Sequence, residues 1–393
     1  RTARAVELAA ASGARSVSLA GMIPSLTAYG FGVLRETEAP TALTTGHAAT
    51  AVSVVKTVHA ALLRTGRGRV GRRDHGEPGR PADLCEPGRC SEPGRCSEPG
   101  RCSDPVSFGE PDDLPGFADL SVAVVGLGSI GSSSLELLLT LASEPPARLL
   151  LCDVPGSAAR LRTLADGLIA RGLARNVEVH ESGRSALPAA VHEVDLLVTA
   201  VSGGGALLDV SRLQPGTIVV DDSFPHCFDT TKALARMRER RDVLIVGGGL
   251  LSVGTGGSGG SAGVGGSASV GGPTGVSEPA DVGGSVERRT APGLPPAVAA
   301  GYAARSWLPD TIASCRLESL LHAADPELPL VHGLVDARLA LAYWRGVEAA
   351  GVTAGPLHLL GHEVAAQDDD LVGFPAVSPD GTASPSSEVA QVP

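Results

Sequence analysis

This chain of 393 residues has few aromatic residues, an excess of negative charge and no long apolar run. Phe, Trp and Tyr make up 3% of the sequence, so Ala, Val and Leu must fill the cores that its 43% hydrophobic content allows. The formal net charge of −11 argues against a nucleic-acid partner, because phosphate binding needs a basic surface. No apolar run approaches the roughly 20 residues that cross a bilayer, which predicts a soluble, cytoplasmic protein without an integral membrane segment. The first residues resemble neither a signal peptide nor a natural start, so we expect the native N-terminus to lie upstream.

The seven cysteines include no Cys-x-x-Cys pair. Four of them lie in one repeat, at Cys85, Cys90, Cys96 and Cys102, in which Cys-Glu-Pro-Gly-Arg is followed by copies of Cys-Ser-Glu-Pro-Gly-Arg. The spacings in this repeat match no usual zinc site, so we interpret it as a duplicated low-complexity linker. His226 and Cys227 are adjacent but lack further ligands nearby in the sequence. The sequence therefore predicts no metal site.

Two segments are too poor in large apolar residues to offset the entropy lost on folding. One covers residues 66–115 and is rich in Gly, Pro, Arg and Glu, and the other covers residues 252–296 and is nearly all Gly, Ser, Val and Ala. We predict that both are disordered insertions, as is a tail over residues 366–393. The remaining blocks are then a nucleotide-binding domain over residues 116–251 and a substrate domain built from residues 1–65 and 297–365.

The middle block alternates apolar strands with helical stretches. The expected strands are 122–125, 148–152, 177–180, 196–200, 218–221 and 243–246, and the expected helices are 132–142, 158–171 and 232–240. This alternation predicts an α/β fold with a Rossmann-type doubly wound parallel sheet. In the flanks we expect helices over residues 48–63, 310–323 and 334–350. The flanks therefore predict a discontinuous substrate domain that is mainly helical or α+β.

A glycine pattern follows the first strand of the middle block. Gly126, Gly128 and Gly131 have the G-x-G-x-x-G order, in which absent side chains let a pyrophosphate and a helix approach closely. The second strand ends at Asp153, about 20 residues later, where a carboxylate binds the adenosine ribose in such sites. The pattern predicts a dinucleotide site, although a purely structural strand-to-helix turn would also use these glycines. Asp153 favours NADH over NADPH, because it would repel a 2′-phosphate.

Ligands of doubly wound sheets bind beyond the carboxyl ends of the strands. We therefore expect further cofactor contacts from the loops after the first, fourth and sixth strands of the block, at Ser129, Ile130, Val201, Ser202, Gly247 and Gly248. Arg160 and Arg162 follow Asp153 closely enough to keep NADPH binding open.

Cys315 is a candidate nucleophile in the last block. Pro309 and Asp310 are typical of a helix start, which would place Cys315 in the second turn of the helix. A thiol near a helix N-terminus can have a lowered pKa, and the thiolate is the reactive form. Cys315 also shares one helical face with Ile312, so a role as a small core residue stays open.

The first block supplies polar side chains for a substrate. His47 lies at the N-terminus of an expected helix, where its imidazole could donate a proton or bind a substrate oxygen. It could also simply cap the helix or pack in the core. Other candidate hydrogen-bonding residues for the substrate lie near it in the sequence: Ser25, Tyr29, Thr44 and Thr45.

Five motifs occur in a recognisable order: Thr-Thr-Gly-His, Val-Ala-Val-Val-Gly, Asp-Asp-Ser-Phe-Pro, Val-Gly-Gly-Gly and Cys-Arg-Leu-Glu-Ser-Leu-Leu. With them, the chain outside the insertions resembles the long-chain acyl-ACP (acyl carrier protein) reductases of the cyanobacterial type. The resemblance implies that Cys315, in a Cys-x-x-Glu-x-x-Leu pattern with Glu318 and Leu321, takes the acyl group from a carrier thioester. A nicotinamide cofactor then reduces the enzyme-bound thioester to an aldehyde.

The chain departs from that family at three points. The family has Asn in place of His47, its glycine turn is one residue longer, and a basic residue that goes with its use of NADPH stands near the position of Asp153. We therefore expect NAD(P)H as cofactor, with NADH favoured, and acyl-ACP or acyl-CoA as substrate.

Two other functions stay open at this stage. One is a dehydrogenase of hydroxy or amino acids that resembles shikimate dehydrogenase and forms no covalent intermediate. The other is a non-catalytic nucleotide-binding protein whose insertions recruit partners. Assembly into a homo-oligomer is also left open.

Overall fold

A computed structural model gives the fold of this chain. It describes residues 1–39, 41–67, 114, 116–183, 185–203, 205–253, 308, 310–364 and 374. Its centre is a six-stranded parallel sheet with the strand order β5-β4-β3-β6-β7-β8. The strands are β3 (Ser121–Val125), β4 (Arg148–Asp153), β5 (Val177–Glu181), β6 (Leu196–Thr199), β7 (Thr217–Asp221) and β8 (Val243–Gly247). The α/β fold with a Rossmann-type sheet, predicted from the sequence, is confirmed.

The sheet is covered on both faces, which explains why its strands are nearly continuous apolar runs. Val122 and Val124 belong to the core under one face, and Ala123 and Val125 to the core under the other. The first face packs against α4 (His47–Arg64), α5 (Ser129–Leu141) and α6 (Ala158–Ala170). The other face packs against α7 (Thr230–Glu239) and the short helices η1 (Ala189–His192) and η2 (Val210–Arg212).

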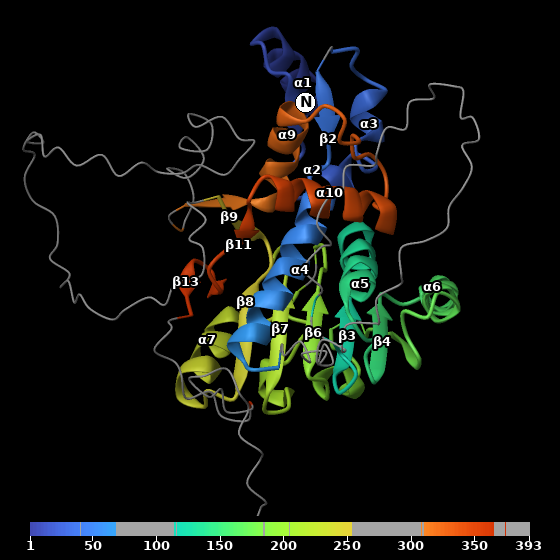
Figure 1. Ribbon diagram of the computed structural model, residues 1–393, viewed down its shortest axis with the longest axis vertical. Coiled ribbons are helices and arrows are strands. Elements are labelled where there is room, and N and C mark those ends of the chain that lie inside the picture. The colour runs from blue at the N-terminus through green and yellow to red at the C-terminus, as the bar shows by residue number, and fades with distance from the viewer. Residues whose placement is uncertain are drawn as a thin grey trace, which may run out of the picture.

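The two flanks of the chain come together beyond one end of the sheet, as Figure 1 shows in blue and orange. The first flank contributes α1 (Thr2–Ala11), β1 (Ser16–Ser18), α2 (Ile23–Leu26), α3 (Phe31–Leu34) and β2 (Ala42–Thr44). The last flank contributes β10 (Thr311–Ala313), α9 (Ser314–Ala324), α10 (Ala337–Ala349), β11 (Thr353–Ala354), β12 (His358–Leu359) and β13 (His362–Glu363). β1 pairs in parallel with β2, and α9 lies against both strands.

Two elements join the flanks to the sheet. α4 comes from the first flank but runs along the sheet beside α5, so its buried face shares one apolar core with the sheet (Figure 1). β9 (Leu250–Ser252) continues the chain after β8 and pairs antiparallel with both β10 and β11. α4 and the last flank therefore share a core with the sheet, whereas the rest of the first flank has a small core of its own, formed by Ala3, Val6, Leu19, Val33 and Leu43.

The helix expected over residues 310–323 begins later than predicted. Thr311 to Ala313 form β10, because their main chain pairs with β9, and α9 starts at Ser314. This tertiary pairing overrides the helix-start signal of Pro309 and Asp310. The prediction that Cys315 lies in the second turn is wrong, since it is the second residue of α9. The next helix likewise begins at Ala337, where the side chain of Asp336 accepts a hydrogen bond of 2.8 Å from the N–H of Leu339, and not at residue 334.

Most of the predicted insertions and tail lie outside the described residues, as do the four cysteines of the repeat. The described ends of these segments are packed. The Arg67 guanidinium forms an ion pair of 2.6 Å with Asp195 and lies over the ring of Phe374. Leu114 is buried, and its N–H donates to the Leu141 carbonyl. Within the described part of the chain, no helix has both the length and the apolar character needed to cross a membrane.

Candidate active site

The three glycines of the turn after β3 have different surroundings. Gly126 has a φ of +84°, and a Cβ there would lie 2.5 Å from the carbonyl oxygen of Ala200. A Cβ on Gly131 would lie 2.0 Å from the Gly126 oxygen, so this glycine lets α5 pack closely on the turn. A Cβ on Gly128 would meet no described atom within 4 Å. The middle glycine thus faces open space at the start of α5, as a pyrophosphate cradle requires.

The next two predicted cofactor residues have partners within the protein. The Ser129 hydroxyl is buried and accepts a hydrogen bond of 3.1 Å from the N–H of Val335, in the last flank. Ile130 packs against the apolar core. Their side chains therefore anchor the helix start, which leaves backbone N–H groups of the first turn of α5 as the groups that can meet a phosphate.

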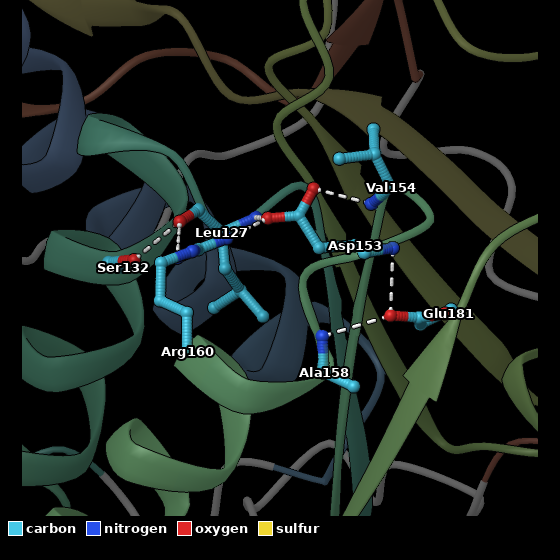
Figure 2. A network of polar contacts seen from close by, with 8 residues as sticks. Leu127, Ser132, Asp153, Val154, Ala158, Arg160 and Glu181 are labelled. Atoms are coloured by element: carbon cyan, nitrogen blue, oxygen red, sulfur yellow. Dashed lines mark hydrogen bonds and ion pairs between the residues drawn. The ribbon is translucent and has the colours of Figure 1, made fainter.

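Asp153 lies beside the glycine turn, as Figure 2 shows. One of its carboxylate oxygens accepts a hydrogen bond of 3.1 Å from the N–H of Leu127 and pairs with Arg160, and the other accepts one of 2.8 Å from the N–H of Val154. Arg160 also donates to the Leu127 carbonyl at 2.7 Å. This clamp joins the ends of β3 and β4 to α6. It was missed in the sequence, where Arg160 was noted only for its closeness to Asp153.

The loops after β6 and β8 differ in how open they are. Val201 lies at the glycine turn, with its Cγ2 3.1 Å from the position of a Cβ on Gly126, and Ser202 is exposed. A Cβ on Gly247 would lie 3.4 Å from Nε2 of His358, and one on Gly248 would lie 3.1 Å from Cγ2 of Val54. Protein atoms therefore fill the space beside Gly247 and Gly248, whereas Val201 borders the glycine turn.

Cys315 lies in the first turn of α9, against the first flank. A Cβ on Gly46 would lie 2.6 Å from the Cys315 oxygen and 2.8 Å from its Cβ, so only glycine allows this contact. The Ser18 hydroxyl donates to the same oxygen. Burial raises the pKa of the Cys315 thiol, and the hydrogen bond of the Gly21 backbone opposes this shift. The thiol is therefore protonated at neutral pH and needs a base to become a nucleophile.

Glu318 caps the start of α4. Its carboxylate is fully buried and accepts hydrogen bonds from the hydroxyl of Thr44 and from three backbone N–H groups: Gly46 at 2.7 Å, Ala48 at 2.8 Å and Ala49 at 3.0 Å. Burial raises the pKa of Glu318, and these hydrogen bonds lower it. The Cys-x-x-Glu and Thr-Thr-Gly-His motifs, far apart in the sequence, are therefore two halves of one capping arrangement.

His47 is the first residue of α4 and is 6% exposed. Burial lowers its pKa to about 4, so the imidazole is neutral at pH 7. Its Nδ1 is buried and has no hydrogen-bond partner among the described residues, and the Tyr29 ring meets it edge-on at a centroid distance of 5.8 Å. In the tautomer that carries its proton on Nδ1, a neutral imidazole can donate a hydrogen bond from this nitrogen to a substrate oxygen.

Some of the predicted substrate-binding residues lie near His47 in the structure, and others do not. Tyr29 and the buried Thr45 lie near His47, and the Thr45 hydroxyl also has no partner within the described ranges. Tyr29 stands in a left-handed turn, since Ala28, Tyr29 and Gly30 all have positive φ. Thr44, in contrast, donates to Glu318, and Ser25 is exposed on α2.

His226 and Cys227 have structural partners. His226 Nδ1 lies 2.5 Å from the buried Asp221 carboxylate, and the Cys227 thiol lies 3.7 Å from the same group. Burial raises the pKa of Cys227 to about 12, which keeps the thiol protonated. No group of three or more potential metal ligands occurs in the part of the chain that the structure describes.

No family model matches this chain, and no curated protein matches its sequence. Solved structures match part of it. The Δ1-pyrroline-2-carboxylate reductase of Thermococcus litoralis, in complex with NADH and L-proline, is 15% identical over 28% of this chain, with a TM-score of 0.22. A probable ornithine cyclodeaminase from Bordetella pertussis Tohama I is 18% identical over 26%, with a TM-score of 0.20. An archaeal alanine dehydrogenase dimer with bound NAD is 17% identical over 27%, with a TM-score of 0.19.

These matches cover 31%, 30% and 29% of the three solved chains, so this chain spans less than a third of the length of each. The similarity to these structures is distant and identifies no specific family. Any assignment of function therefore depends on the geometry of the site itself.

Proposed function

We infer that this protein reduces an acyl thioester, carried by acyl carrier protein or CoA, to an aldehyde with NAD(P)H. The observation that carries this proposal is the position of Cys315, which lies at the start of α9 in direct contact with Gly46, next to His47. Both residues stand in motifs that resemble those of acyl-ACP reductases. Glu318 holds the two motifs together.

The proposed reaction begins when the Cys315 thiol loses its proton and its sulfur attacks the thioester carbonyl. The bond from the carbonyl carbon to the carrier sulfur then breaks, the carrier takes up the proton and leaves as a thiol, and the acyl group stays on Cys315. The neutral imidazole of His47 would donate a hydrogen bond to the oxygen on which negative charge develops. Tyr29 would fix the orientation of that ring, and the Thr45 hydroxyl offers a second donor nearby.

The nicotinamide cofactor supplies the hydride that converts the acyl-enzyme to the aldehyde. The residues of this chain that would hold the nicotinamide cofactor are consistent with this proposal. Gly128 leaves room for the pyrophosphate, and Asp153 lies where an adenosine ribose would meet the end of β4. Val201 borders the same turn, and Ser202 is the exposed residue that follows it. We favour NADH, because the Asp153 carboxylate can accept hydrogen bonds from ribose hydroxyls.

Incubation with acyl-CoA or acyl-ACP, without nucleotide, tests this function directly. Peptide mass spectrometry should find one acyl group on Cys315, and Cys315→Ala should form no adduct and no aldehyde while it binds NADH with unchanged affinity. Cys152→Ala is the matched control, because that thiol is buried in the sheet, and its pKa of about 12 keeps it protonated. Full aldehyde formation by Cys315→Ala would refute the covalent mechanism.

A further inference from the structure

Three buried polar atoms at the junction of the two flanks have no hydrogen-bond partner among the residues that the structure describes. They are the hydroxyl oxygen of Thr45, Nδ1 of His47 and Nε2 of His332. Thr45 and His47 belong to the first flank, whereas His332 lies between α9 and α10 in the last flank. An unpaired buried polar atom costs free energy, so its presence in a folded protein calls for an explanation. A ligand that pairs with these atoms would supply one.

The turn that contains Gly30 contacts all three side chains. A Cβ on Gly30 would lie 3.4 Å from Cγ2 of Thr45 and 3.5 Å from Cδ2 of His332, which is the ring carbon bonded to Nε2. The neighbouring Tyr29 ring meets the imidazole of His47 edge-on, with the centroids 5.8 Å apart. The unpaired groups of Thr45 and His332 therefore lie against the same residue, although they come from opposite flanks.

Main-chain hydrogen bonds fix His332 in this position. The N–H of Thr45 donates to the Val331 carbonyl at 3.1 Å, and the N–H of Gly333 donates to the Tyr29 carbonyl at 3.0 Å. The residues on both sides of His332 are thus tied to the first flank. A ligand that meets this imidazole would lose little binding energy to ordering it, because the ring is already held in place.

The tautomer of His332 determines which kind of group its free nitrogen can meet. Burial lowers the pKa of the imidazole, and a hydrogen bond to the Leu43 backbone opposes this shift. The ring is therefore neutral at pH 7. Because Nε2 has no partner within the described ranges, we assign this hydrogen bond to Nδ1, which donates its proton to the Leu43 carbonyl. Nε2 is then the unprotonated nitrogen, so its partner must be a hydrogen-bond donor.

We propose that Nε2 of His332 accepts a hydrogen bond from an amide N–H of the pantetheine arm that acyl carrier protein and CoA share. This inference rests on the proposed function and names the part of the carrier that the site holds. The thioester group has only acceptor atoms and cannot supply this donor. A secondary amide has both an N–H and a carbonyl oxygen, and the hydroxyl of Thr45 donates to that oxygen.

The position of Thr45 relative to Cys315 is consistent with this arm. Thr45 precedes Gly46, where a Cβ would lie 2.8 Å from the Cβ of Cys315. In the pantetheine arm, two carbons separate the sulfur of the thioester from the nearest amide nitrogen, so this amide enters the site together with the thioester. His47, the residue after Gly46, then donates to the thioester oxygen while His332 and Thr45 hold the arm.

Binding of unreactive carrier analogues tests the proposal. The probe is an S-alkyl pantetheine, a thioether that cannot transfer an acyl group. Its matched analogue has an ester in place of the amide nearest to the sulfur, so it lacks the N–H donor and keeps the carbonyl. Wild type should bind the amide probe about tenfold or more tightly than the ester probe, because a buried acceptor is otherwise left unpaired. His332→Phe, which removes the acceptor, should bind the two probes equally. Isothermal titration calorimetry measures the dissociation constants.

Two further variants serve as controls. His332→Gln keeps an acceptor oxygen at this position and should restore part of the preference for the amide. His192→Gln is the matched control, because the Nε2 of His192 is also buried and has no partner in the described part of the chain. His192 lies in η1, on the opposite face of the sheet from α4, so its replacement should leave the preference unchanged.

A preference for the amide that persists in His332→Phe would overturn the proposal. Equal binding of the two probes by wild type, or binding of neither, would also overturn it, and these two results need no variant to fold. An amide preference that depends on His332, in a wild-type protein that forms no acyl adduct on Cys315, would instead refute the proposed function. The two failures are distinguishable because the probes bind without acyl transfer.

Discussion

The Glu318 carboxylate accepts a hydrogen bond of 2.7 Å from the backbone N–H of Gly46, a residue 272 positions earlier in the chain. This contact holds the N-terminal half of α9 against the start of α4. Cys315 then lies against Gly46, the residue before His47, although the two segments come from opposite ends of the sequence.

Replacement of Glu318 by Ala should destabilise the fold strongly. The change leaves the hydroxyl of Thr44 and the N–H groups of Gly46, Ala48 and Ala49 buried without an acceptor. We expect the free energy of unfolding to fall by about 3 kcal/mol or more, since each unsatisfied buried donor costs on the order of 1 kcal/mol. Urea denaturation measures this change. Glu363→Gln, at an exposed position in β13, is the control, and a loss below about 1 kcal/mol would contradict the capping role.

The buried imidazole of His47 should make stability depend on pH. Its pKa is about 4 in the folded protein and near 6.5 in the unfolded chain, so the unfolded state binds more protons between these values. Stability should therefore fall as the pH decreases through this window, by about 2 kcal/mol between pH 7 and pH 5 from this group. The comparison of wild type with His47→Gln at both pH values isolates the effect, because other histidines contribute equally to both proteins. Equal pH dependence in the two proteins would show that His47 titrates normally.

Alanine substitutions at two glycines of the turn should separate folding from nucleotide binding. Gly128→Ala places a methyl group in open space, so the melting temperature should stay unchanged while NADH affinity falls at least tenfold. Gly131→Ala forces a methyl group against the Gly126 oxygen and should cost roughly 1–3 kcal/mol of stability. Thermal melts and fluorescence titration with NADH measure both effects. Normal NADH binding by Gly128→Ala would place the cofactor elsewhere.

The choice between NADH and NADPH should depend on Arg160. Its side chain is 53% exposed, and its guanidinium pairs with Asp153, where it can meet a 2′-phosphate while it offsets the charge of the carboxylate. Arg160→Ala should raise the KM for NADPH about tenfold more than the KM for NADH. Steady-state kinetics with both nucleotides measure the ratio. Arg162→Ala, two residues further along α6, is the matched control. Equal changes in KM for the two cofactors in Arg160→Ala would contradict the prediction.

The strands and the glycine turn were readable from the sequence because their signals are local. Each predicted strand of the sheet matches an observed one to within a residue at either end, since buried parallel strands are short apolar runs between turn residues. The start of α9 could not be predicted from the sequence. Thr311 and Ile312 are ordered by pairing with β9, a segment about 60 residues earlier, and no local pattern reports such a partner.

The sequence by itself determined the Rossmann-type sheet, the position of the glycine turn and the set of residues that can react. Those depend on apolar periodicity and on glycine, which act over a few residues. Only the tertiary structure decided which groups meet: Glu318 caps the start of α4, Arg160 pairs with Asp153, and Cys315 lies against Gly46. It also decided that Ser129 and Thr44 are occupied by protein partners. Burial and long-range hydrogen bonds set these roles, because both arise only when distant segments pack together.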